Sequence, residues 1–591
     1  MLRRARRIAP LFGNLSWFGA GCAILLSLIG AQTANAASAT LSVDAAKTSG
    51  PLKTFVNFAQ GRRGTFDRFT TGEQTRLTAV GTRLVRIDAM LHIISTAEGV
   101  YDWTLLDGNI ENVQATGADV LLTLGYMPTW LADTSYGTDP YVTGYGYAQN
   151  PPTDFAKWQQ LVRDVVFHLN ITKGYGIKYF AVWNEPNLTL VSSTGMSGYY
   201  PLYKYAAQGV KAADPTAKVG GPTVAGFDTA GLQGLINYVK ANSLPLNFVN
   251  WHGYEDTLPS KLPGRAATVR SWLTAAGLPT AELIMTEWNA DQGPPVIEDD
   301  PLVITRSAGM VAPMNWYALD AGLSEIFYFR VKRPAPTLQG IIQDGGTPPF
   351  PQYNSFTMLS MMAGTRISAS EAMDANGIGV GALAAKDPDV VTVLTWNYQN
   401  TGTTSFSTDL VVSSLPSEFS GKSIRMKRYL VDETHSNVTY DPTKAELEKV
   451  EDLVLPPAAG VSRTFTLQPN AVSLIVLSPE GGSSAADTTA PSAPTNLRNP
   501  SVSSSAAYLM WSASSDNVKV VGYKVYRQGV QVATTASTSY SDPGLTASTT
   551  YSYTVRAYDA AGNTSAPSNA VSVTTQALDA APAPPKGLQV F

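Results

Sequence analysis

The feature that most constrains the fold is an alternation that runs from about residue 55 to residue 364. Short runs rich in β-branched and aromatic residues recur there, and longer segments with apolar residues at helical spacing, such as 155–169, separate them. This alternation is typical of a parallel sheet covered by helices. The strands expected from it are Phe55–Phe58, Leu84–Asp88, Val120–Leu124, Tyr179–Trp183, Lys218–Gly221, Phe248–His252, Leu283–Glu287 and Ile326–Phe329.

Eight strand–helix units in roughly 310 residues match the size of a (β/α)8 barrel with loop insertions. An open, doubly wound sheet is the alternative. That arrangement commonly carries a glycine-rich phosphate loop after its first strand, and no such loop follows residues 55–58. We therefore expect residues 55–364 to form a (β/α)8 TIM barrel.

The sequence after the barrel loses the helical period. Residues 365–479 alternate apolar and polar residues in short runs, which predicts an antiparallel β-sandwich. Residues 37–54 precede the barrel, and Thr40 to Leu52 are candidates for a further strand of that sandwich. A segment rich in Gly, Ser and Ala then indicates a flexible linker over 480–493.

The C-terminal part resembles a fibronectin type III module over residues 494–576. The resemblance rests on aromatic and apolar residues such as Trp511, Tyr523 and Tyr553 in alternating strand contexts. Modules of this kind usually act as spacers or docking units, so we expect docking to glycans or cell surfaces and no chemistry here. A tail, 577–591, repeats the opening residues of such a module.

The first 36 residues predict an export signal. Four arginines lie within the first seven residues, an apolar stretch follows, and Ala34-Asn35-Ala36 fits the small-residue cleavage rule. A membrane anchor is the alternative, but the apolar stretch is short for a span of about 20 residues. The only cysteine, Cys22, lies in this leader, so the mature chain would have no disulfide. We expect a secreted protein that leaves the membrane after cleavage.

Charge narrows the range of partners. The chain has 42 Lys and Arg against 46 Asp and Glu, a formal net charge of −4, and loss of the leader would make it −8. This balance disfavours nucleic acid and anionic membranes as partners. Charged residues make up only 15% of the chain, whereas Gly and Pro number 49 and 38, which suits a loop-rich extracellular protein.

Two glutamates follow strands of the expected barrel. The fourth strand ends in Trp183-Asn184-Glu185-Pro186, and the seventh ends in Thr286-Glu287-Trp288-Asn289. Active sites of such barrels lie at the C-terminal ends of the strands, and strands 4 and 7 are nearly opposite in an eight-membered ring. Glu185 and Glu287 can therefore face one cleft, although a single strand-end glutamate is often only a surface acid. A facing pair is what glycosidic cleavage requires, since one carboxyl group donates a proton and the other attacks.

These motifs resemble those of retaining glycoside hydrolases of clan A, and most of all family 39, best known for β-xylosidases. The resemblance covers about residues 50–480 and implies that Glu185 is the general acid/base and Glu287 the nucleophile. It further implies substrate-binding or supporting roles for Asn184, Arg86, His252 and Tyr254. Asn184 would bind the sugar 2-hydroxyl, Arg86 would keep the nucleophile ionised, and the other two would orient the acid and contact the nucleophile. No cofactor and no metal are implied.

Two stretches depart from the family pattern. The eighth strand reads Phe327-Tyr328-Phe329-Arg330, where the clan usually has a tryptophan under the bound sugar. The third strand runs into Gly125-Tyr126-Met127-Pro128 without a histidine. The loop after it, Leu131 to Asn150, carries Tyr136, Tyr141, Tyr145 and Tyr147, which either form a platform for the leaving group or only pack the loop down.

The expected function is therefore a secreted, retaining, exo-acting β-xylosidase-like hydrolase acting on plant-type oligosaccharides. An endo-acting polysaccharide depolymerase of the same clan is one alternative. A non-catalytic carbohydrate-binding or adhesive protein on an inactive barrel is another. A metallohydrolase is weaker, because the histidines besides His252 are His92, His168 and His435, and none has ligand spacing in the sequence.

Overall fold

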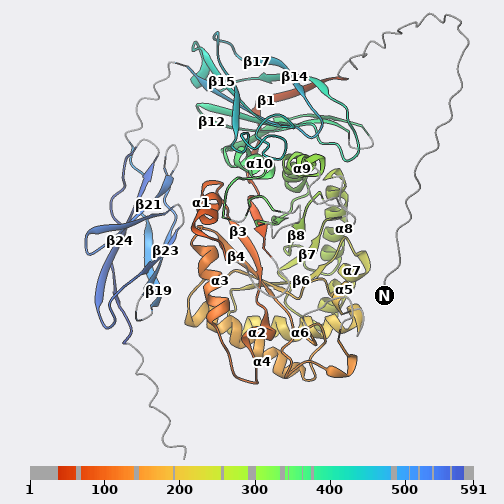
Figure 1. Cartoon of the computed structure of the whole chain (residues 1–591), viewed down its shortest axis with the longest axis vertical. Coiled ribbons are helices and arrows are strands. Elements are labelled where there is room, and N and C mark those ends of the chain that lie inside the picture. Colours follow the sequence, from red (N-terminus) through yellow and green to blue (C-terminus); the bar gives the residue numbers. More distant parts are fainter. Residues whose placement is uncertain are drawn as a thin grey trace, which may run out of the picture. The chain divides into compact units, whose positions relative to one another are not determined.

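The computed structural model describes most of the chain between residues 37 and 577 (Figure 1). The described residues are 37–60, 68–138, 146–190, 194–254, 259–290, 301–332, 340–343, 345–362, 364–374, 378–480, 489–502, 504, 506–516, 520–535, 538–559 and 562–577. The expected leader, residues 481–488 of the expected linker and residues 578–591 of the expected tail lie outside them.

Eight parallel strands close into a barrel, so the open sheet is wrong and the expected (β/α)8 fold is confirmed. The strands follow one another around the ring in chain order, and β2 pairs with β9 to close it. Their bounds are β2 (Asn57–Ala59), β3 (Leu84–Asp88), β4 (Asp119–Leu124), β5 (Tyr179–Val182), β6 (Lys218–Val224), β7 (Phe248–His252), β8 (Glu282–Trp288) and β9 (Glu325–Phe329).

Helices follow these strands and cover the outside of the barrel (Figure 1). Helix α4 begins behind Asp154, whose carboxylate accepts the N–H groups of Ala156 and Lys157, as an N-cap should. The helices are α1 (Thr71–Ala79), α2 (Leu91–Ile94), α3 (Thr104–Gln114), α4 (Phe155–Val166, continued by a π-helical turn at Phe167–Thr172), α5 (Pro186–Thr189), α6 (Gly195–Ala213), α7 (Thr229–Asn242), α8 (Leu262–Ala275), α9 (Pro301–Asp320) and α10 (Pro351–Ser360).

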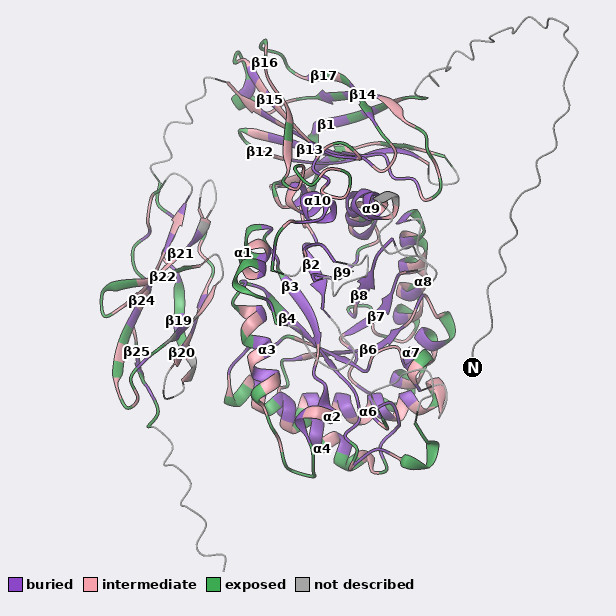
Figure 2. Cartoon of the chain, in the orientation of Figure 1, coloured by how far each residue is buried: buried purple, intermediate pink, exposed green. Residues whose placement is uncertain are grey.

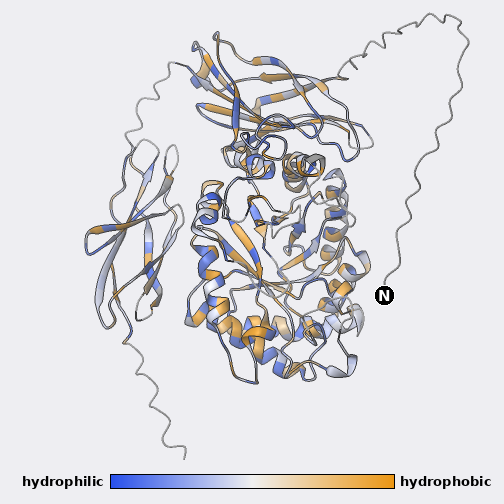
Figure 3. Ribbon diagram, viewed as in Figure 1, coloured by the Kyte–Doolittle hydropathy of each residue, from blue (hydrophilic) through white to orange (hydrophobic). Residues whose placement is uncertain are grey.

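The barrel interior changes from apolar to polar along the strands. An apolar layer consists of Ala59, Leu84, Leu121, Ala181, Phe248, Ile284 and Phe327. Side chains two positions apart on a strand share a face. Two positions beyond Leu84, Leu121, Phe248 and Ile284 stand the buried polar side chains of Arg86, Thr123, Asn250 and Thr286. The polar layer lies toward the C-terminal ends of the strands. Figure 2 shows the barrel strands as largely buried, and Figure 3 shows both hydrophobic and hydrophilic residues among them. The fold thus places a layer of buried polar side chains near the C-terminal end of the barrel.

The part of the chain that packs beside the barrel is a sheet of ten strands with a hydrophobic core of its own. Its order is β16-β15-β18-β13-β12-β10-β1-β14-β17, and β11 pairs with β12. Leu41 of β1, Leu410 of β14 and Ile475 of β18 lie in one buried cluster, as in a sandwich. The strands are β1 (Ala37–Pro51), β10 (Thr365–Ala369), β11 (Glu371–Met373), β12 (Gly379–Asp387), β13 (Val390–Trp396), β14 (Phe406–Ser413), β15 (Ile424–Val431), β16 (Glu448–Leu455), β17 (Val461–Leu467) and β18 (Val472–Pro479).

Strand β1 enters this sheet from before the barrel and lies between β10 and β14. It pairs antiparallel with β10 but parallel with β14, so one pair departs from the expected antiparallel pattern. A parallel pair needs a long connection, and here the whole barrel separates the two strands in the sequence. The sheet also shares the barrel's core, since Trp396 of β13 and Leu474 of β18 belong to the same buried cluster as the barrel strands.

The C-terminal part, described by itself, has two sheets around a separate core. Trp511, Tyr523 and Val555 are among its buried residues. One sheet has the order β19-β20-β23 and the other β22-β21-β24-β25. The strands are β19 (Thr495–Val502), β20 (Ala506–Ser512), β21 (Val520–Arg527), β22 (Val530–Thr535), β23 (Ser539–Pro543), β24 (Thr550–Asp559) and β25 (Val571–Thr574). Among the described helices of the whole chain, none combines the length and apolarity that crossing a membrane requires.

Candidate active site

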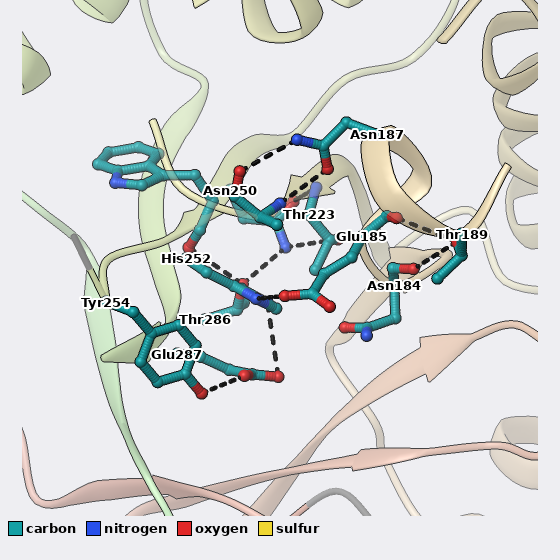
Figure 4. A network of polar contacts seen from close by, with 12 residues as sticks. Asn184, Glu185, Asn187, Thr189, Thr223, Asn250, His252, Tyr254, Thr286 and Glu287 are labelled. Carbon is teal, nitrogen blue, oxygen red and sulfur yellow. Dashed lines mark hydrogen bonds and ion pairs between the residues drawn. The ribbon is translucent and has the colours of Figure 1, made fainter. Parts of the chain in front are cut away.

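Glu185 and Glu287 lie face to face at the mouth of the barrel (Figure 4). Glu185 follows β5 and begins the short helix α5, whereas Glu287 belongs to β8. Ligand atoms of Glu185, His252 and Glu287 all lie within 4.8 Å of one another. The two walls of the barrel thus bring two carboxyl groups, far apart in the sequence, into one site.

A register shift turns Glu287 toward the interior. On β8, Thr286 accepts a hydrogen bond from the interior amide of Asn250 at 3.2 Å, so simple alternation would send the next side chain outward. The pairing of β8 with both neighbouring strands shifts at this point. As a result Glu287 contacts Arg86 across the barrel, and Trp288 enters the buried core. Bulges commonly re-aim side chains in this way beside active sites.

A different irregularity aims Glu185. Trp183 and Glu185 both have left-handed backbone conformations, with φ of 69° and 49°. Such values are uncommon for residues other than glycine and persist where the surrounding structure holds them. Here the Glu185 N–H donates to the carbonyl of Thr223 on β6 at 2.9 Å. The chain is thereby turned at the strand end, and the Glu185 side chain points toward His252 (Figure 4).

Both carboxylate oxygens of Glu287 accept hydrogen bonds. Nη1 of Arg86 donates to Oε1, and the hydroxyl of Tyr254 donates to Oε2 at 2.5 Å. The side chains of Glu287 and Arg86 are 10% and 2% exposed. Burial and the charge of Glu287 raise the pKa of Tyr254 well above its usual value, so this phenol remains a donor over the whole range in which proteins are studied. Together the two donors compensate the negative charge of Glu287.

Arg86 connects several groups of the site. Its Nε donates to Thr123 Oγ1 at 3.0 Å, and its Nη2 donates to Asn184 Oδ1 at 2.6 Å. Burial alone would lower the pKa of Arg86, but the charges of Glu287 and Asp88 outweigh it and raise the pKa. Arg86 is therefore a permanent cation fixed beside Glu287. Because Asn184 accepts from Arg86 through its oxygen, its NH2 group is left to donate toward a ligand.

His252 bridges the two glutamates. Its Nδ1 lies 2.9 Å from Oε1 of Glu185, and its Nε2 lies 3.5 Å from Oε1 of Glu287. The ring is fully buried, whereas the side chain of Glu185 is 24% exposed. The hydrogen bond holds the Glu185 carboxyl group in one orientation, and the side chain remains partly exposed.

A second layer of polar residues holds these groups in place, and sequence reasoning missed it. Asn250 donates to the hydroxyls of Thr223 and Thr286 at 2.9 and 3.2 Å. Asn187 exchanges two hydrogen bonds with the backbone of Ala225, which ties α5 to the end of β6. Asn250 lies on an expected strand facing the interior, and that position was the available signal.

Asp88 is a third carboxylate of the site that sequence reasoning did not single out. It follows Arg86 by two positions on β3, and its Oδ1 lies 3.5 Å from Arg86 Nη2. Burial raises the pKa of Asp88, and the charge of Arg86 opposes this rise only in part. The alternation of Leu84-Val85-Arg86-Ile87-Asp88 was the signal, since it places Arg86 and Asp88 on one face.

The residues that depart from the family pattern lie in different places. The ring of Phe329 meets that of Tyr254 edge to face at 6.1 Å, so it lies beside the nucleophile's hydrogen-bond donor. Of the loop tyrosines, Tyr136 is 41% exposed, whereas Tyr147 packs against the barrel core. Tyr141 and Tyr145 lie outside the described residues.

Metal binding is the other chemistry that this cluster could perform by spacing, because its three ligand atoms lie within 4.8 Å of one another. However, both oxygens of Glu287 already accept hydrogen bonds, one of them from a buried guanidinium group. A cation would have to displace or adjoin Arg86. The arrangement therefore fits carboxyl chemistry better than metal chemistry.

Comparison with known families agrees with this site. Residues 39–262 match the family described as glycosyl hydrolases family 39, and residues 492–574 match the fibronectin type III domain. The resemblances to family 39 and to a fibronectin type III module that the sequence indicates are thus confirmed over these two regions. The match includes Arg86, Glu185 and His252 but ends before Glu287, whose place rests on the barrel geometry.

The glycoside hydrolase domain has relatives among curated proteins and solved structures. A β-xylosidase of Geobacillus stearothermophilus is 28% identical over 217 residues, 33% of this chain and 42% of that one. A β-xylosidase of Caldicellulosiruptor saccharolyticus is 34% identical over 161 residues, 26% and 31% of the two chains. This chain spans less than half the length of either. The crystal structure of a monomeric β-xylosidase from Caulobacter crescentus CB15 matches with a TM-score of 0.61 at 19% identity, over 75% of this chain and 100% of that one, and supports the fold.

Proposed function

We propose that this protein is a retaining glycoside hydrolase that removes terminal β-xylose-type residues from oligosaccharides. The observation that carries the proposal is the approach of Glu185 and Glu287 within 4.8 Å. Retaining enzymes have carboxyl groups about 5–5.5 Å apart, whereas inverting enzymes need about 6.5–9.5 Å to seat a water between them. The close pair supports direct attack on the sugar.

In the first step Glu287 attacks the anomeric carbon. Its carboxylate oxygen forms a bond to that carbon while the bond to the leaving oxygen breaks, and Glu185 gives its proton to that oxygen. Arg86 and Tyr254 compensate the charge of Glu287 before the attack. The NH2 group of Asn184 is available to the 2-hydroxyl of the sugar, next to the carbon at which positive charge develops.

In the second step water releases the sugar. Glu185, now a carboxylate, accepts a proton from water, and the oxygen of that water forms a bond to the anomeric carbon as the ester bond to Glu287 breaks. His252 holds Glu185 in one orientation through both steps by its 2.9 Å hydrogen bond. The resting protonation states are restored, and the configuration at the anomeric carbon is retained.

The sugar and the mode of action are inferred from the relatives. Two curated relatives are named β-xylosidases, and the matched family domain agrees with them. We infer exo action on plant-type oligosaccharides from this likeness. The export signal expected at residues 1–36 would make the enzyme a secreted one, and the fibronectin type III module suits docking to a glycan or a cell surface.

The test is a panel of aryl glycosides with NMR detection of the first-formed sugar. The proposal expects turnover of 4-nitrophenyl β-D-xylopyranoside and initial release of the β-anomer. Release of the α-anomer would contradict the retaining mechanism. Xylo-oligosaccharides should lose one xylose at a time. Rapid shortening of polymeric xylan without free xylose would favour the endo-acting alternative, and binding without turnover of any glycan would favour a carbohydrate-binding protein.

A further inference from the structure

The proposed mechanism leaves one buried carboxylate of the site without a task. Asp88 ends β3, and its side chain is 11% exposed, about as much as that of Glu287. Arg86 and Asp88 lie two positions apart, so both face the barrel interior, whereas Ile87 between them enters the core behind the strand. Asp88 therefore lies beside the guanidinium group that also contacts Glu287 and Asn184.

Among the described residues, few groups satisfy the Asp88 carboxylate. Thr123, its register partner on β4, has a side chain that acts to lower the pKa of Asp88, against the effect of burial. The contact with Arg86 is long, 3.5 Å, and the same guanidinium group bonds more closely to Glu287 and to Asn184. A carboxylate accepts up to about four hydrogen bonds. Asp88 thus has unused acceptor capacity in a site where burying an unpaired charge is costly.

The position of Asp88 relative to a sugar follows from Arg86. One nitrogen, Nη2, contacts both Asn184 Oδ1 at 2.6 Å and Asp88 Oδ1 at 3.5 Å, so these two residues are neighbours across the guanidinium group. If a sugar has its anomeric carbon at Glu287 and its 2-hydroxyl at Asn184, Asp88 is the neighbouring acceptor across Arg86 for the hydroxyls on the ring carbons that follow. These hydroxyls are donors, which is what Asp88 lacks.

We propose that Asp88 is a specificity-determining residue that accepts a hydrogen bond from the 3- or 4-hydroxyl of the sugar at the site of cleavage. This rests on the proposed function and deepens it. The substrate is then a neutral sugar with a free hydroxyl at that position. A carboxylate on the sugar ring would meet a third acid beside Glu185 and Glu287 and would be disfavoured.

The experiment compares Asp88→Asn with the wild type on 4-nitrophenyl β-D-xylopyranoside and on its 3-deoxy and 4-deoxy analogues. A hydrogen bond to a charged group predicts that Asp88→Asn loses about 10- to 100-fold in kcat/KM on the parent glycoside. On the analogue that lacks the recognised hydroxyl, the wild type and the variant should agree within about twofold, because that interaction is already absent.

Asp107→Asn is the matched control, since the Asp107 side chain is 12% exposed and pairs with His168 and Lys173 outside the site. It should leave the ratio between the three glycosides unchanged. If Asp88→Asn does not fold, Asp88→Ser gives the same comparison. An equal loss on all three glycosides would overturn the inference and make Asp88 a support for Arg86. No turnover of any aryl glycoside by the wild type would instead refute the proposed function.

Discussion

The two walls of the barrel mouth present the same residue type in different surroundings. On the β8 wall, Glu287 accepts hydrogen bonds on both oxygens, from Arg86 and Tyr254, and its side chain is 10% exposed. On the β5 wall, Glu185 bonds to His252 through one oxygen, and its side chain is 24% exposed. Glu287 is held by a cation and a phenol, whereas Glu185 is the more exposed of the two side chains.

This difference is what a division of labour requires. A nucleophile must be ionised and aimed, and the fixed donors around Glu287 provide both. A general acid must exchange a proton with the leaving group and later with water, so it needs an open side. Environment, and not residue type, separates the roles of paired carboxyl groups.

The largest effect is expected on the β8 wall. Glu287→Gln keeps the shape of the side chain but removes the attacking oxygen anion, so kcat/KM should fall by about 10⁴-fold or more. Steady-state kinetics on aryl glycosides checks this. Glu98→Gln, which alters an exposed ion pair with Lys157, is the control and should have wild-type activity. A loss below tenfold in Glu287→Gln would mean that another group attacks the sugar.

The β5 wall should respond according to the leaving group. In Glu185→Ala the loss should be about 10² to 10⁴-fold on alkyl glycosides, which need a proton, and much smaller on 2,4-dinitrophenyl glycosides, which do not. Added azide should react with the glycosyl-enzyme and give a glycosyl azide of the substrate's own configuration. Losses that are equal on both kinds of substrate would remove the distinction between the two walls.

Arg86→Lys should impair the alignment of Glu287 on the β8 wall without changing Glu287 itself. Lysine keeps the charge but cannot contact Glu287, Thr123 and Asn184 at once, so kcat should fall by about 10²-fold as Glu287 loses its alignment. Arg76→Lys, at an ion pair with the exposed Glu446, is the matched control and should leave kcat unchanged. Thermal unfolding of both variants shows whether the loss is one of folding. An unchanged kcat in folded Arg86→Lys would exclude an aligning role.

Tyr254→Phe should have the smallest effect, a loss of about 10-fold from one hydrogen bond to a charged group. Because the pKa of Tyr254 lies well above its usual value, Tyr254 does not titrate in the range in which the enzyme acts. The basic limb of the pH profile of kcat/KM should therefore persist in Tyr254→Phe but disappear in Glu185→Ala. Tyr203→Phe, whose hydroxyl bonds to the Pro245 carbonyl away from the site, is the control. A basic limb that vanishes with Tyr254 would assign it to the phenol.

Much of the barrel could be predicted because its parallel strands are largely buried on both faces. Such strands appear in the sequence as short apolar runs that are easy to recognise. The segments Leu84–Asp88 and Phe248–His252 have the expected bounds. The first strand was expected at 55–58 but lies at Asn57–Ala59, since Phe55 and Val56 are buried without being part of the ladder. An apolar residue in the sequence indicates that its side chain is buried. Whether its backbone pairs in the sheet depends on the strands beside it.

The positions of the two glutamates could be predicted from the strand ends, but the directions of their side chains could not. Strand ends locate Glu185 and Glu287, but alternation alone would have turned Glu287 outward, and only the register shift on β8 explains its direction. The amide network of Asn250 and the position of Asp88 depend on side chains that meet across the barrel. No single segment of the sequence contains that information.

The most direct test of the division of labour is covalent trapping. Incubation with 2,4-dinitrophenyl 2-deoxy-2-fluoro-β-D-xylopyranoside should inactivate the enzyme with time and add one fluorosugar per chain. The account predicts that peptide mapping by mass spectrometry finds this sugar as an ester on Glu287. A label on Glu185, or turnover of xylosides with no trapped sugar on Glu287, would contradict it.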